Sequence, residues 1–159
     1  MTHQTHDLKL CFEDLLVGQT FVSGSRAVEM EAMRAFALEF DPQPIHLNAD
    51  CSLLGGIVAS GWYTAAITHR LLIDDGFPMK HGMIGLGVEL SWPAPARAGD
   101  ILRVKTRIDE VRPSRSKKDR GIVTIYSETL TAQDVVVQKQ TATILVTRRS
   151  IFHAPELLS

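Results

Sequence analysis

The sequence predicts an α+β domain in which one long antiparallel sheet wraps a central helix. The second half of the chain carries the strand signal. Four segments rich in Val, Ile, Leu and Thr, separated by short turns, occupy residues 84–96, 101–111, 121–131 and 135–146. Residues 62–73 carry the helix signal, because they are nearly apolar all round until Arg70. A helix without a polar face is usually buried on several sides.

Length and composition indicate a single domain over residues 1–159, with a peripheral leader at 1–10 and a peripheral tail at 149–159. Apolar residues make up 45% of the chain and charged residues 22%, as in an ordinary globular protein. A net charge of −1 argues against nucleic acid or an anionic membrane as the partner of the whole molecule. Cys11 and Cys51 lack metal-ligand spacing and suggest reduced structural thiols, so we expect a cytoplasmic protein.

The first half of the chain predicts one strand and two helices before the apolar one. Residues 20–28 form the expected strand, and residues 29–40 place Met30, Met33, Ala37 and Phe40 at helical steps. Asn48 can cap a brief helix over 49–54, which Gly55-Gly56 ends. Ser60 is the expected N-cap of the apolar helix.

The segment between the first two helices holds two titratable residues, Asp41 and His46. Pro42 and Pro44 lack backbone donors and push the residues before them toward extended backbone, so we expect a short, stiff loop rather than a helix. A carboxylate and an imidazole held on one loop can perform acid–base chemistry. The alternative is that Asp41 caps a local turn and His46 packs in the interior.

Taken together, helices first and four long strands after, this order is a hot-dog arrangement. The Asp41…His46 loop behind an Ala/Phe-rich helix, the approach Gly55-Gly56-Ile57-Val58-Ala59-Ser60-Gly61 and the segment Glu89-Leu90-Ser91-Trp92-Pro93-Ala94-Pro95 resemble the MaoC-like family. That family comprises (R)-specific enoyl-CoA hydratases and acyl dehydratases. The resemblance covers roughly residues 12–148. Better-known members carry Asn where Gln43 stands, His where Ser60 stands and a small Ser near His69.

The resemblance implies that water adds to a trans-2-enoyl-CoA thioester to give an (R)-3-hydroxyacyl-CoA, or the reverse. Asp41 and His46 suit the acid–base roles, and which of them takes the proton from water stays open. The backbone N–H of Gly61, at the first turn of the apolar helix, can stabilise the charge on the thioester oxygen. A simple tight turn is the other interpretation of Gly61. His69 is expected to be a hydrogen-bonded core residue.

Basic residues gather in the second half of the chain. Arg103, Lys105 and Arg107 alternate and therefore share one face of a strand, and Arg115 and Lys117 lie in the following loop. They suit the phosphates of coenzyme A or, alternatively, form a solvated surface. We assign Gln43, Ser60, Arg103, Arg115 and Lys117 to substrate binding. No metal or other cofactor is implied, coenzyme A being part of the substrate.

The expected partner is a second copy of the chain. A hot-dog sheet has an exposed edge, and the family's usual solution is a homodimer or a dimer of dimers. Nucleic acid and membrane are not expected. Two other functions stay open: a catalytically idle protein that binds acyl thioesters or serves in assembly, and an acyl-CoA thioesterase. A thioesterase of this fold generally carries a carboxylate on the central helix, and residues 62–73 offer none.

Overall fold

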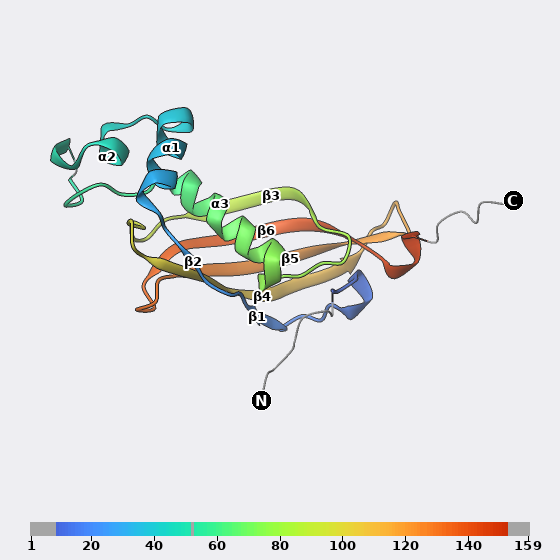
Figure 1. Ribbon diagram of the computed structural model, residues 1–159. Helices are drawn as coiled ribbons and strands as arrows, with labels where there is room; N and C mark the ends of the chain where they lie inside the picture. Colours follow the sequence, from blue (N-terminus) through green and yellow to red (C-terminus); the bar gives the residue numbers. More distant parts are fainter. Residues whose placement is uncertain (1–8, 52, 153–159) are drawn as a thin grey trace, which may run out of the picture.

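A computed structural model describes residues 9–51 and 53–152 and shows one antiparallel sheet with a helix across one face (Figure 1). The strand order is β1-β4-β5-β6-β3, and β2 also pairs with β4. The strands are β1 (Thr20–Val22), β2 (Arg26–Ala27), β3 (Ile84–Ser91), β4 (Ile101–Pro113), β5 (Arg120–Leu130) and β6 (Val136–Thr147). The predicted α+β fold is confirmed.

The four long strands lie close to their predicted positions. In β4 the buried side chains alternate with exposed ones, so that Leu102, Val104, Thr106 and Ile108 face the core. The predicted strand over 84–96 is shorter than expected and ends at Ser91, before Pro93 and Pro95. The predicted strand over 20–28 was wrong as one element: Ser23, Gly24 and Ser25 separate β1 from β2.

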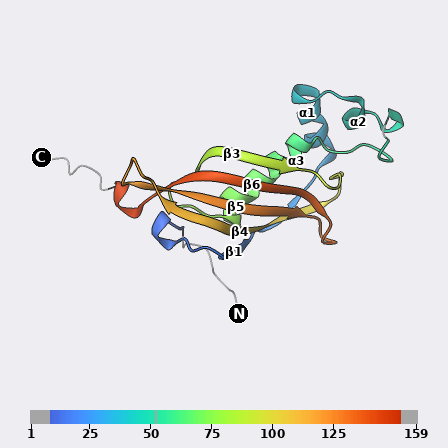
Figure 2. The ribbon, with the colours of Figure 1, turned by 180° about the vertical axis from the view of Figure 1, so that it is seen from behind.

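Helix α3 (Gly61–Leu71) runs across the concave side of the sheet, and a turn of π-helix over Leu72–Gly76 continues it. Its core side consists of Thr64, Ile67, Thr68 and Leu71. The expected burial on several sides is wrong for this chain, because Trp62 keeps 59% of its surface exposed. Seen from behind, the opposite face of the sheet shows no helix in the described part of the chain (Figure 2).

Helices α1 (Met30–Phe40) and α2 (Pro44–Leu47) project together beyond the N-terminal end of α3 (Figure 1). The expected loop over 41–46 is only half correct. Gln43 has extended backbone, but Pro44 begins a short helix that contains His46. Proline is tolerated at the first helical position, because the N–H that it lacks would have no acceptor there.

The residues after α2 form a tighter turn than expected. A single 3-10 turn spans Ala49–Cys51, and the Asn48 side chain accepts a hydrogen bond from the Asp50 N–H at 3.0 Å. Gly55 and Gly56 follow with positive φ angles of 73° and 120°. This compact connection returns the chain from α2 to the start of α3.

Candidate active site

Asp41 is the residue on which three segments converge. It closes α1, where its backbone N–H donates to the Ala37 carbonyl at 2.9 Å. Its side chain accepts hydrogen bonds from Ser60 Oγ and from Gln43 Nε2, each at 2.6 Å. The His46 Nε2 atom lies 3.2 Å from Asp41 Oδ2. The structure therefore brings together Asp41, Gln43, His46 and Ser60.

His46 is buried, and its ring is fixed from the opposite side by the backbone. Nδ1 lies 2.9 Å from the Val58 carbonyl oxygen. A carbonyl oxygen can only accept, so Nδ1 carries a hydrogen. The hydrogen bond between Nε2 and the Asp41 carboxylate needs a second hydrogen, on Nε2. The pair is thus built to hold one mobile proton between Nε2 and Oδ2.

The surroundings of Asp41 favour its ionised form. The hydrogen bond from Ser60 lowers the pKa of this carboxyl most, and the bond from Gln43 lowers it further. Partial burial opposes this shift, and the charge and hydrogen bond of His46 add to it. Asp41 is therefore a carboxylate at neutral pH and stays ionised to a lower pH than an ordinary aspartate.

Ser60 joins the carboxylate to the start of α3. It is fully buried, and its Oγ accepts a hydrogen bond from the Trp62 N–H at 3.2 Å while donating to Asp41. The predicted N-cap is confirmed. The one hydroxyl therefore joins the Asp41 carboxylate to the first turn of the helix.

Gly61 is the first residue of α3, where the N–H has no acceptor within the helix. A Cβ at Gly61 would lie 2.7 Å from the Trp92 ring. A side chain at this position would therefore collide with the Trp92 indole. Gly61 and His46 line one cavity of about 280 Å³, which Thr64 and Trp92 also line.

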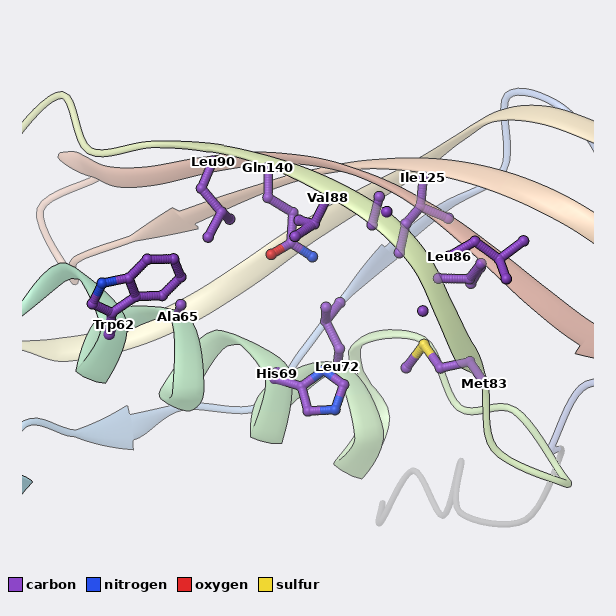
Figure 3. A pocket seen from close by; sticks show the side chains of 14 residues that line it. Trp62, Ala65, His69, Leu72, Met83, Leu86, Val88, Leu90, Ile125 and Gln140 are labelled. Atoms are coloured by element: carbon purple, nitrogen blue, oxygen red, sulfur yellow. The ribbon is translucent and has the colours of Figure 1, made fainter. Parts of the chain in front are cut away.

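A second, apolar cavity of about 480 Å³ lies between α3 and β3 (Figure 3). Trp62 and Met83 stand at its opposite ends. His69, expected in the core, is exposed and lines this cavity instead. We call this cavity the α3–β3 groove.

Of the basic residues assigned to substrate binding, Arg115 and Lys117 lie far from Asp41 and His46 within one chain. Arg103, Lys105 and Arg107 share the face of β4 opposite the core, as expected, and Arg103 pairs with Asp134. Arg115 and Lys117 lie in the turn after β4. Strand β4 begins beside β2, close to α1, and the 13 residues of β4 span roughly 40 Å. The turn that holds Arg115 and Lys117 therefore lies at the far end of the sheet.

The comparison with protein families decides the identity. The sequence profile described as "MaoC like domain" matches residues 15–131. The chain belongs to the MaoC-like family. A MaoC-like dehydratase from Rhodospirillum rubrum of known crystal structure is 52% identical, with a TM-score of 0.85 over 88% of this chain and 98% of that one.

Two curated proteins are also similar to this MaoC-like chain. The uncharacterized protein YdeM of Bacillus subtilis is 29% identical over 86% of this chain and 98% of its own length. A 3-hydroxybutyryl-CoA dehydratase of Methylorubrum extorquens is 32% identical over 68% of this chain and 69% of its own length. The resemblance that the sequence suggested, and the hot-dog fold, are confirmed.

Two negative findings concern the described part of the chain. Residues 9–51 and 53–152 contain no group of three or more His, Cys, Asp and Glu side chains placed to hold a metal ion. Within the same residues, every helix is too short or too polar to span a membrane.

Sequence reasoning missed two groups that shape the site. The Val58 carbonyl fixes the His46 ring, but a backbone acceptor leaves no signal in the residue types. Trp92 covers Gly61, and it lay inside a motif already singled out, Glu89 to Pro95. The available signal was Trp92 itself, a bulky aromatic residue between Ser91 and Pro93, where a cavity wall could be expected.

Proposed function

We propose that this MaoC-like protein adds water to a trans-2-enoyl-CoA thioester to give an (R)-3-hydroxyacyl-CoA, or catalyses the reverse dehydration. The observation that carries the proposal is the Asp41–His46 pair, with a carboxylate oxygen and a ring nitrogen 3.2 Å apart. The similarity to a 3-hydroxybutyryl-CoA dehydratase supports the reaction class. A hydro-lyase needs one group that takes a proton and one that gives a proton on the same side of the substrate.

The hydrogen bonds of the pair suggest how the two roles divide. Asp41, an ionised acceptor, takes a proton from the attacking water, whose oxygen bonds to C3. His46 gives its Nε2 proton to C2. The enzyme then holds a protonated Asp41 and a neutral His46, and one proton transfer across the 3.2 Å gap restores the starting state. Every proton is accounted for, and dehydration runs the same steps backwards.

The reaction also needs a group that stabilises the negative charge that develops on the thioester oxygen. Gly61 lines the same cavity as His46, and its N–H is unused by its own helix. The positive end of the α3 dipole lies at this N–H and favours a developing oxyanion. Catalysis thus combines one backbone donor with two side chains from the α1–α2 region.

We infer further that the protein forms a homodimer through β3. This strand lies at the edge of the sheet, and Ile84, Leu86 and Val88 are each more than half exposed. An unpaired edge with an apolar row favours pairing with another strand. A second copy of β3 supplies one across a two-fold axis.

The test is the loss of enoyl-thioester absorbance with crotonyl-CoA and longer enoyl-CoAs. Asp41→Asn and His46→Gln keep the shape of the site and remove its proton chemistry. We expect turnover by the wild type and a fall of about 10²–10⁴-fold in each folded variant. Glu39→Gln, on exposed α1 surface beside the site, is the matched control and should keep wild-type rates. Release of free thiol instead of hydration would indicate a thioesterase, and binding without turnover would indicate an idle binding protein.

A further inference from the structure

Thr64 lies one turn after Gly61 on α3 and shares its side of the helix. Both residues line the cavity of about 280 Å³ beside His46, which we call the catalytic cavity. Trp62 and His69, on another side of α3, line the α3–β3 groove instead. The side of α3 that faces the catalytic cavity thus carries two groups that can donate a hydrogen bond, the Gly61 N–H and the Thr64 hydroxyl.

The Thr64 hydroxyl points back toward the first turn of the helix. Its Oγ1 lies 3.4 Å from the Ser60 carbonyl oxygen, as expected for a helical side chain, which leans toward the N-terminus. The Gly61 N–H, which has no acceptor within the helix, belongs to the same turn. Thr64 is buried, so few water molecules compete for its hydroxyl. A shielded side-chain donor therefore stands beside an open backbone donor.

The hydrogen bond that holds the Thr64 hydroxyl is a weak one. A separation of 3.4 Å is long for two oxygen atoms, which usually lie about 2.7–2.8 Å apart. Thr68, one turn further on, shows a fully bonded hydroxyl, at 2.9 Å from the Thr64 carbonyl and 2.6 Å from Thr129 Oγ1. The Ser60 carbonyl also accepts the Thr64 backbone N–H at 3.1 Å. The hydroxyl can therefore turn its hydrogen to a ligand without leaving that carbonyl unpaired.

We propose that Thr64 is a further catalytic residue, whose hydroxyl donates a second hydrogen bond to the thioester oxygen beside the Gly61 N–H. The inference rests on the function proposed above and adds one group to its site. Negative charge develops on the thioester oxygen when water adds to C3, and two donors that are already in place stabilise it better than one. Thr64 keeps its proton throughout, so the proton balance of Asp41 and His46 is unchanged.

Infrared spectroscopy of bound butyryl-CoA, isotope-labelled at the thioester carbonyl carbon, tests this proposal without turnover. A hydrogen bond to a carbonyl oxygen lowers the stretching frequency of the C=O bond. We expect a lowered frequency in the wild type and in Thr64→Ser, which keeps the hydroxyl. In Thr64→Val the frequency should move toward that of the free thioester, and Thr64→Ala should repeat this result. With crotonyl-CoA, Thr64→Val should lower kcat about 10²-fold at a similar KM.

Thr124→Val is the matched control, because the Thr124 hydroxyl also makes a hydrogen bond of 3.4 Å, to Glu110 Oε2, and does not line the catalytic cavity. It should change neither the frequency nor kcat. The proposal would be overturned by a wild-type frequency equal to that of the free thioester, by an equal frequency in the wild type and both variants that lack the hydroxyl, or by a Thr64→Ser that behaves like Thr64→Val.

Failure of the Thr64 proposal can be told from failure of the proposed function. The turnover of crotonyl-CoA by the wild type is scored separately from the carbonyl frequency. Turnover with a frequency that Thr64→Val leaves unmoved refutes only the role of Thr64. A frequency that moves as expected, without turnover of any enoyl-CoA, refutes only the hydratase function.

Discussion

Replacing Ser60 by alanine removes one hydroxyl that serves two parts of the site. The Oγ atom donates to the Asp41 carboxylate at 2.6 Å and accepts from the Trp62 N–H at 3.2 Å. A hydrogen bond to a charged group contributes about 1.5–3 kcal/mol to stability, and an N-cap about 1 kcal/mol. We expect Ser60→Ala to lower the free energy of unfolding by about 3 kcal/mol. For a chain of this size the melting temperature should fall by roughly 9 °C.

The same variant should change the pH dependence in a defined direction. Ser60 is the main cause of the lowered pKa of Asp41, so its loss raises that pKa toward the ordinary value. The acid limb of the kcat/KM profile therefore moves to higher pH, because Asp41 must be ionised to accept a proton. In the wild type, the stability from this lowered pKa is complete above the pKa of an unfolded aspartate. It is lost as the pH falls through the lower folded value.

Urea unfolding and a pH–rate profile measure the two effects, and Asp41→Asn separates them. In the Asp41→Asn background the Ser60 hydroxyl donates to a neutral amide oxygen, so Ser60→Ala should cost about 1 kcal/mol less than in the wild type. An equal cost in both backgrounds, together with an unmoved acid limb, would refute the coupling between Ser60 and Asp41.

Three further changes probe other contacts. Gly61→Ala places a Cβ 2.7 Å from the Trp92 ring and should lower the free energy of unfolding by about 1–3 kcal/mol, measured by thermal unfolding. An unchanged melting temperature would show that the indole moves freely. Val88→Lys puts a charge on the β3 edge and should yield a monomer by gel filtration, whereas a persistent dimer would place the interface elsewhere. Thr68→Val leaves Thr129 without its 2.6 Å hydroxyl partner and should lower the unfolding free energy by about 1–3 kcal/mol; a stability equal to wild type would contradict this bond.

The strands could be predicted because their residue types and turns agree with one another. Gly99 adopts a φ of 92° and Asp134 a φ of 62° at the turns where the sequence placed them. Pro113 ends β4 and Arg120 begins β5, so the loop between them lies where the expected strands over 101–111 and 121–131 left it. In the second half of the chain, the strand and turn preferences of the residues agree with the fold that the whole molecule adopts.

The region around the site was harder to predict, because tertiary contacts decide it. The two prolines predict a loop, yet Pro44 occupies the first position of a helix, which proline tolerates. The even apolar composition of residues 62–73 suggested burial all round, but one face of α3 stays open in the single chain. Asp41 and His46 were found from residue type and a resemblance. The partners of these two residues, the Ser60 hydroxyl and the Val58 carbonyl, depend on segments that only the fold brings near.

The core side of α3 also carries hydroxyl groups where alkyl groups would pack as well. Thr64 Oγ1 bonds to the Ser60 carbonyl at 3.4 Å, Thr68 Oγ1 to the Thr64 carbonyl at 2.9 Å, and Thr68 Oγ1 meets Thr129 Oγ1 of β5 at 2.6 Å. Hydrocarbon surfaces can slide past each other with little loss, whereas a buried hydroxyl pair is satisfied at one position only. The Thr68–Thr129 pair therefore fixes the register of the helix on the sheet. A slip of one turn, about 5.4 Å, would break that pair and carry Ser60 and the Gly61 N–H out of reach of Asp41 and His46.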